Sequence, residues 1–176
     1  MIEEILNNPL AHICALIGFV FLIISTQVKE KNKILVFQSL FLFFFFLQYI
    51  LLGIYSASIL NIVSLIRNIV YYKSDNKKST YFILLFTLIV GIICTIYDSK
   101  NYILVISIVP LIINLLYAFV LNQKEIVKIK KVFLFCSIVW IVYDFFVKAY
   151  VGLICNTLEM LSYVIYFVRR KKWELE

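Results

Sequence analysis

The feature that most constrains this chain is a series of seven apolar segments, each close to the length that crosses a lipid bilayer. They cover residues 9–28, 34–54, 57–73, 79–97, 101–121, 132–149 and 152–169. A membrane-spanning helix needs about 20 mainly apolar residues, within a range of roughly 17–25. Backbone polar groups inside lipid have to be paired within the segment, and helices achieve this. The sequence therefore predicts an all-α membrane protein with seven transmembrane helices.

The composition leaves lipid as the solvent for these segments. Of the 176 residues, 64% are hydrophobic and only 15% are charged, whereas about a quarter of a typical soluble domain is charged. A small soluble globule buries only part of its surface, so it could not hide this much apolar area. Glu3 and Glu4 stand where a cleaved signal peptide has basic residues, and we expect the first helix to be retained.

The distribution of basic residues predicts the orientation of the helices. Fourteen of them follow spans one, three, five and seven, namely Lys29, Lys31, Lys33, Lys73, Lys77, Lys78, Lys124, Lys128, Lys130, Lys131, Arg169, Arg170, Lys171 and Lys172. The opposite connections carry Lys100 and Lys148. Basic loops remain in the cytoplasm. With an odd number of spans, we expect the N-terminus outside and the C-terminus in the cytoplasm.

Other classes of protein find little support. The net charge of +7 comes from residues between apolar runs, so we expect no nucleic-acid binding. The chain has no Gly-rich phosphate loop, no H-E-x-x-H and no G-x-S-x-G motif, and the single histidine, His12, supports no metal site. The four cysteines lie singly in apolar segments and imply no disulfide framework. A membrane enzyme could use Asp144 or Glu159, but nothing further supports one. We expect no enzymatic activity, cofactor or metal.

An internal repeat relates the two halves of the chain. A shift of 95 residues aligns Tyr55 with Tyr150, Ile59 with Ile154, Asn61 with Asn156 and Tyr71 with Tyr166. The span boundaries coincide at the same offset. One intervening span restores the starting side of the membrane, so the halves run parallel about an axis along the membrane normal. This predicts a 3+1+3 arrangement, with three-helix repeats in residues 1–73 and 101–176 and a linker helix in residues 74–100.

The arrangement and its asparagines resemble a known group of transporters. An Asn on the third helix of each parallel half is similar to the SWEET and PQ-loop transporters. The stretch from Leu47-Gln48-Tyr49 through Gly53-Ile54-Tyr55 and Asn61 to Arg67-Asn68 resembles the YgjV family of bacterial inner-membrane proteins. The resemblance implies a multi-pass protein of the bacterial inner membrane. It also implies a substrate cavity between the two bundles, where Asn61 and Asn156 correspond to the paired asparagines of the SWEET fold.

Each third helix carries a polar stripe on one face. Asn61, Ser64 and Asn68 recur at i, i+3 and i+7, and Asn156, Glu159 and Tyr163 occupy the matching positions of the last span. We take these six residues as candidate substrate-binding residues. The alternative for the asparagines is hydrogen bonding between helices, which contributes about 0.6 kcal/mol on average in a well-studied membrane protein.

Apart from basic residues at or next to the span ends, three charged residues lie within the predicted spans: Arg67, Asp144 and Glu159. Polar groups at membrane depth are costly and tend to face the bundle interior. Glu159 is deeper than Asp144, and we expect it to be paired or partly protonated; both acids are candidates for proton coupling. Arg67 is near enough to the inner end of its span to snorkel, and its pairing with Glu159 stays open. Further hydrogen bonds could come from Gln38, Gln48, Asn114 and Tyr117, while Phe41–Phe46 is expected to contact lipid or pack.

Together these features predict a transporter or permease for a small polar solute, such as a sugar or a similar metabolite. Transport would proceed by alternating access between the two three-helix bundles, with Asn61 and Asn156 facing each other across a shared cavity. The alternative is a non-transporting membrane sensor or scaffold that keeps the same fold, since fold does not dictate function. The expected partners are the lipid bilayer and the solute, and homo-oligomerisation is left open.

Overall fold

The computed structural model describes residues 8–53, 55–74, 76–98, 108–123, 125–146 and 150–173. These residues form seven α-helices and no strand: α2 (Pro9–Gln27), α3 (Lys31–Leu51), α4 (Tyr55–Lys73), α5 (Lys77–Asp98), α7 (Val109–Val120), α8 (Ile126–Phe146) and α9 (Tyr150–Trp173). The prediction of an all-helical protein is confirmed. The predicted start of the fifth span, residues 101–107, lies outside the described residues.

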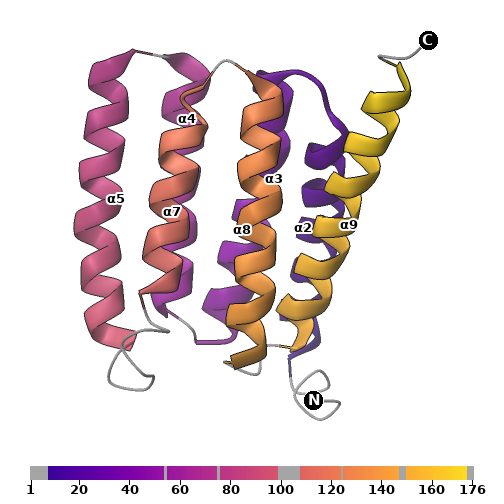
Figure 1. Ribbon diagram of the computed structural model, residues 1–176. Coiled ribbons are helices and arrows are strands. Elements are labelled where there is room, and N and C mark those ends of the chain that lie inside the picture. Colours follow the sequence, from indigo (N-terminus) through magenta and orange to yellow (C-terminus); the bar gives the residue numbers. More distant parts are fainter. Residues whose placement is uncertain are drawn as a thin grey trace.

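The helices stand side by side in two layers (Figure 1). One layer holds α5, α7, α8 and α9, and the other holds α4, α3 and α2 behind them. Direct contacts run from α2 to α3, α3 to α4, α4 to α7, α7 to α8, α8 to α9, and α9 back to α2. These six helices therefore form a closed ring. Helix α5 lies outside it, packed on α4 and α7.

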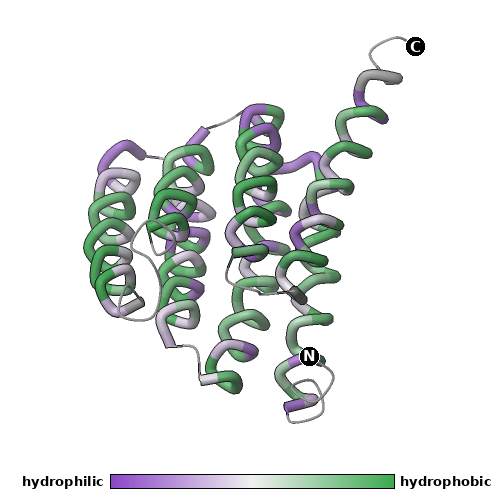
Figure 2. Tube along the Cα trace, turned by 60° about the horizontal axis from the view of Figure 1, so that its bottom comes forward, coloured by the Kyte–Doolittle hydropathy of each residue, from purple (hydrophilic) through white to green (hydrophobic). Residues whose placement is uncertain are grey.

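The side chains on the outside of the bundle are largely apolar. Leu16, Phe82 and Val168 are among many large hydrophobic residues that are more than half exposed. Figure 2 shows hydrophobic residues along the lengths of the helices and hydrophilic ones at several of the connections. A soluble monomer rarely exposes contiguous apolar patches of more than a few hundred Å². An apolar outer surface of this kind suits a protein surrounded by lipid.

By length and composition, three helices are suited to cross a membrane: α2, α3 and residues Lys77–Tyr97 of α5. Helix α7 is apolar but has only 12 described residues. Helices α4, α8 and α9 have 19, 21 and 24 residues, long enough to cross, but polar and charged side chains dilute their apolar character. Among the described residues, all seven predicted spans are helical, while the number that cross the membrane remains a prediction.

The largest difference in helix boundaries occurs at α8. The apolar run predicts a start at residue 132, whereas the helix begins at Ile126 and includes Lys128, Lys130 and Lys131. Lysine is a good helix former, and Lys128 pairs with Glu125 at 2.8 Å just before the helix starts. Hydropathy therefore marks where the apolar part of a helix begins, and the helix itself extends into the basic segment.

The buried hydrophobic core of the protein lies at one end of the bundle. We call this end the basic end, because the basic connections after α2, α4 and α7 lie there. Its buried cluster contains Leu35, Tyr71, Ile83, Ala118, Val120, Leu121, Ile129, Phe133 and Tyr163. At this end α3, α5 and α8 begin and α2, α4 and α7 end (Figure 1). The opposite end holds the tight turn between α3 and α4, where Gly53 has φ +71°, a left-handed conformation that glycine adopts without strain.

Candidate functional site

A cavity of about 470 Å³ lies inside the ring, and all six ring helices line it. It reaches from Ser56 and Gly152, in the first turns of α4 and α9, to Arg67 three turns further along α4. Beyond Arg67 the buried cluster fills the bundle. The cavity therefore occupies the half of the protein opposite the basic end.

The structure brings four of the six candidate substrate-binding residues together. Asn61, Ser64, Asn156 and Glu159 line the cavity, as does the second acid, Asp144. Asn68 is fully buried one turn beyond Ser64 and borders a separate, apolar hollow between α3 and α4. Tyr163 is also buried beyond the cavity. Its ring packs against Phe133, with 6.3 Å between the ring centroids.

Asp144 and Asn156 connect α8 and α9 on the cavity wall. Asn156 Nδ2 donates a hydrogen bond of 2.7 Å to Asp144 Oδ2. Asp144 is 6% exposed and is therefore buried, although it lies only two residues from the end of α8. A side-chain Cβ at Gly152 would lie 2.8 Å from Asp144 Oδ2. Glycine at this position therefore lets the carboxylate approach the backbone of α9.

Glu159 has its own partner on α8. The Ser137 hydroxyl donates a hydrogen bond of 2.9 Å to Glu159 Oε2, and Glu159 is 5% exposed. Its hydrogen-bonding partner Ser137 is neutral, and the expectation that Glu159 is paired or partly protonated stays a prediction. Ser137 was not singled out from the sequence. A signal was present, because Lys130, Ser137 and Asp144 recur every seven residues and so share one face of α8.

The opposite wall offers amides and hydroxyls. Ser64 donates a hydrogen bond of 2.8 Å to Asn114 Oδ1, and Asn114 Nδ2 donates to the Pro110 carbonyl at 2.9 Å. The Asn61 side chain lines the cavity and has no hydrogen-bonding partner among the described residues. The two aligned asparagines thus differ: the amide of Asn156 is bound to Asp144, whereas that of Asn61 is free.

Arg67 lies at the inner end of the cavity and does not snorkel. It is 3% exposed, and its Nε and Nη2 each donate to Asn68 Oδ1 at 3.2 Å. Its Cζ lies 5.7 Å from the centroid of the Tyr117 ring, a distance at which a cation is attracted to the face of the ring. Within the described parts of the chain, no ion pair joins Arg67 to Glu159. The guanidinium thus lines the cavity.

Aromatic rings form much of the remaining wall. Phe41, Phe45 and Tyr49 of α3 succeed one another along the cavity, with ring centroids 4.5 Å and 6.1 Å apart. Trp140 and Tyr143 of α8 also contribute. The sequence assigned the Phe41–Phe46 run to lipid or packing, which fits Phe43, an exposed residue, but not the cavity-lining Phe41 and Phe45. The four-residue spacing of Phe41, Phe45 and Tyr49 could have separated the two faces.

At the basic end, polar contacts join α2 to α9 and α8. Thr26 Oγ1 is hydrogen-bonded to Ser162 Oγ, and Gln27 Nε2 donates to the Ser162 hydroxyl and carbonyl, each at 2.8 Å. Lys130 Nζ donates to the carbonyls of Thr26 at 2.5 Å and Val28 at 2.6 Å. We call these residues the polar seal.

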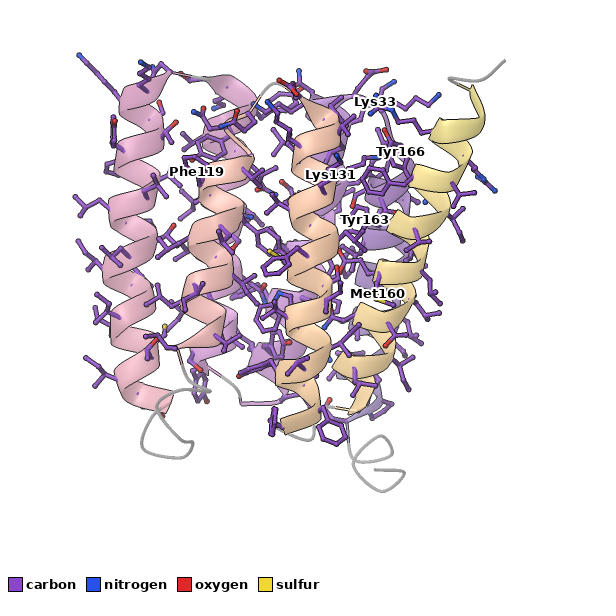
Figure 3. The ribbon with its side chains drawn as sticks, in the orientation of Figure 1. Lys33, Phe119, Lys131, Met160, Tyr163 and Tyr166 are labelled. Atoms are coloured by element: carbon purple, nitrogen blue, oxygen red, sulfur yellow. The ribbon has the colours of Figure 1, made fainter. Side chains whose placement is uncertain are left out.

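An aromatic side chain covers the ammonium group of the polar seal. The Lys130 nitrogen lies 3.5 Å from the centroid of the Tyr166 ring, which supplies a cation–π contact. Figure 3 shows Tyr163 and Tyr166 between α9 and its neighbours, with Lys131 on α8 nearby. Lys130 is 1% exposed, so the polar seal holds a buried cation at the end of α2, where helix carbonyls favour positive charge.

The cavity brings several kinds of polar group together with an aromatic wall. It combines free or partly free amide and hydroxyl groups, one guanidinium and two carboxyl groups with an aromatic wall. Pockets for small molecules have volumes of about 300–1,000 Å³ and are mostly apolar with a few placed polar groups. Among the described residues, no group of three or more His, Cys, Asp or Glu side chains is arranged to hold a metal ion.

Comparison with family models gives one match over most of the chain. The model of the Imp-YgjV family, described as bacterial inner membrane protein, matches residues 9–174. The match covers all seven helices described above. No curated protein and no solved structure matches the chain.

Proposed function

Because the chain belongs to the Imp-YgjV family of bacterial inner membrane proteins, we propose that it carries a small polar solute across that membrane through the cavity. The observation that carries the proposal is the cavity itself: six helices enclose it, polar side chains line it, and the buried cluster and the polar seal close it at one end. Closure at one end is what one state of an alternating-access transporter requires, and in this proposal solute enters from the other end.

The proposal includes a 3+1+3 organisation with parallel repeats in residues 1–73 and 101–176. The helix boundaries support it: α8 (126–146) begins and ends 95 residues after α3 (31–51), and α9 begins 95 residues after α4. The position of α5 outside the ring also fits a linker helix. In this proposal all seven helices cross the membrane, the N-terminus lies outside and the basic end faces the cytoplasm, as the charge distribution predicts.

In this orientation the protein opens and closes where the two bundles meet. Two sets of contacts join them at the basic end. On one side the polar seal connects α2 with α9, and on the other the Tyr71 hydroxyl donates a hydrogen bond of 2.7 Å to the Ala118 carbonyl, joining α4 to α7. Rigid-body rocking of one bundle against the other would break these contacts and open the cavity to the cytoplasm.

Passage is either passive or linked to protons. Glu159 and Asp144 are the acids that could carry a proton, because both line the cavity and both are buried. The rival proposal is a sensor or scaffold that uses the same cavity without moving solute. We propose no enzymatic role, because among the described residues we identify no catalytic arrangement beyond the two cavity acids.

Flux measurements in proteoliposomes test the proposal. The purified protein is reconstituted, and entry of a panel of labelled neutral, zwitterionic and charged solutes is followed. Asn61→Trp should fill the cavity and reduce flux at least tenfold. Its matched control is Ile62→Trp, which places the same ring on an exposed position of α4. Flux that is equal in the two variants, or absent for every solute in the wild type, would favour the sensor or scaffold.

A further inference from the structure

Arg67 is a buried positive charge that has no anionic partner among the described residues. A charged side chain within a membrane-spanning helix is costly, and such residues normally pair with an opposite charge or with backbone carbonyls. Arg67 is nine-tenths buried and lies in α4 at the inner end of the cavity. Within the described part of the chain, its side chain contacts the neutral Asn68 Oδ1 and the face of the Tyr117 ring. Among the described residues it therefore lacks an anionic partner.

The donors of Arg67 are only partly used. A guanidinium carries five N–H donors in a planar fork, and two of its three nitrogens contact Asn68 Oδ1. Nη1 has no hydrogen-bonding partner in the part of the chain that the structure describes. Because the residue lines the cavity, the free donors are available to a ligand there. A planar fork of this kind matches a carboxylate, which it binds with two parallel hydrogen bonds.

The acids of the cavity lie on the other side and at a different depth. Glu159 is bonded to Ser137, and Asp144 to Asn156. Helices α4 and α9 start at the same end of the bundle (Figure 1). Arg67 is 12 residues from the start of α4, and Glu159 is nine residues from the start of α9. At a rise of 1.5 Å per residue, Arg67 lies about 4.5 Å, or one turn, deeper than Glu159.

We propose that the solute is a small zwitterionic amino acid, with its carboxylate bound by Arg67 and its ammonium group directed towards Glu159. The inference rests on the proposed function and deepens it. An amino acid presents a carboxylate and an ammonium group, which complement a guanidinium and an acid that line the same cavity. A solute with only negative charge would be repelled by the two acids. The aromatic wall of Phe41, Phe45 and Tyr49 would accept an apolar side chain.

Binding to the intact protein in lipid nanodiscs tests the proposal. The probes are L-leucine, L-leucinamide, which lacks the carboxylate, 4-methylpentanoate, which lacks the ammonium group, and glycerol as a neutral polyol. The fluorescence of Trp140, which lines the cavity, and the thermal unfolding midpoint report binding. We expect leucine to bind at least tenfold more tightly than leucinamide and more tightly than 4-methylpentanoate.

The variants separate ligand binding from a structural role of Arg67. Arg67→Gln should weaken leucine binding at least tenfold, whereas Arg169→Gln, which removes an exposed arginine, should leave it unchanged. If Arg67→Gln does not fold, Arg67→Lys retains the charge without the fork and should still weaken binding several-fold. Glu159→Gln should abolish the preference for leucine over 4-methylpentanoate.

Several results would overturn the proposal. These are equal binding of leucine and leucinamide, binding of none of the carboxylates, or unchanged leucine binding in a folded Arg67 variant. Its failure is distinguishable from that of the proposed function. Flux of glycerol without leucine binding would reject the amino-acid ligand and keep transport. Leucine binding at Arg67 without flux of any solute would keep the ligand and reject transport.

Discussion

Asn156 on α9 donates a hydrogen bond of 2.7 Å to the carboxylate of Asp144 on α8. The two residues sit on the cavity wall, and Asp144 is buried. The side-chain amide of Asn156 is therefore already hydrogen-bonded within the protein. Its counterpart 95 residues earlier, Asn61, has no hydrogen-bonding partner among the described residues. This asymmetry leads to the first prediction.

Asn156→Ala should destabilise the protein by about 1–3 kcal/mol, because it leaves the buried Asp144 without this donor. Thr157→Ala is the matched control. It removes a hydroxyl whose bond of 2.7 Å runs to the Leu153 carbonyl within α9, and the backbone keeps its own partners. Unfolding in detergent, followed by thermal melting, measures both. If Asn156→Ala is no less stable than Thr157→Ala, the Asp144 contact contributes nothing to the fold.

Glu159→Gln should remove the pH dependence of solute flux while leaving the fold intact. The glutamine amide keeps an oxygen that accepts the hydrogen bond from Ser137. Unlike the carboxylate, it cannot take up a proton between pH 5 and 8. Flux of the best solute is measured across pH 5–8 in proteoliposomes. Asp144→Asn, the parallel change in the second acid, shows which carboxyl group is responsible. A pH profile of Glu159→Gln that matches the wild type would make Glu159 a structural residue.

Lys130→Met should weaken the basic end of the bundle by about 2–3 kcal/mol, since a charged donor with two carbonyl partners is lost. Those partners are the carbonyls of Thr26 and Val28. Lys131→Met provides a close control, because the neighbouring lysine is exposed. Thermal melting of the two variants side by side gives the comparison. Equal melting temperatures would show that the polar seal is incidental to the structure.

The orientation of the bundle is tested by labelling with an impermeant thiol reagent in intact cells. We expect a cysteine at Lys77, the first residue of α5, to be protected from reagent outside the cell because that connection is basic. A cysteine at Tyr55, the exposed first residue of α4, lies at the opposite end and should react. Reaction at position 77 and protection at position 55 would reverse the orientation.

The helices were largely predictable from the sequence because apolar length has a direct physical meaning in a membrane. The prediction for α2 ends within one residue of the observed helix, and α4 ends at Lys73 as expected. The start of α8 was missed because hydropathy assigns the hydrophilic residues Lys128, Lys130 and Lys131 to a loop. Lysine nevertheless favours the helical conformation. A hydropathy window finds the part of a helix in lipid and misses its polar extension.

The site was predictable only where helical spacing places residues on one face. Asn61, Ser64, Asn156 and Glu159 share the cavity as their spacing indicated. Asn68 obeys the same spacing but lies one turn deeper, where packing has filled the bundle. Whether a residue on this face lines the cavity depends on how deep along the bundle the neighbouring helices pack against one another. The residue pattern of a single helix does not contain that information.

Contacts between distant segments were beyond the reach of the sequence. The bond between Ser137 and Glu159 and that between Gln27 and Ser162 each join different helices. They depend on which faces meet, and the repeat alone does not specify the partners. Arg67 illustrates the point: its distance from the inner end of its span suggested snorkelling, yet its side chain is buried in the bundle and lines the cavity.

The accessibility of a cysteine at position 61 tests the central claim most directly, namely that the cavity opens in turn to each side of the membrane. The native cysteines, including the cavity-lining Cys155, are first replaced by serine, and Asn61→Cys is introduced. A small impermeant thiol reagent is then applied to right-side-out and to inverted vesicles. Alternating access predicts modification from both sides, faster from outside because the polar seal closes the basic end, and protection by a bound solute. Modification from one side only, or from neither side, would contradict the account.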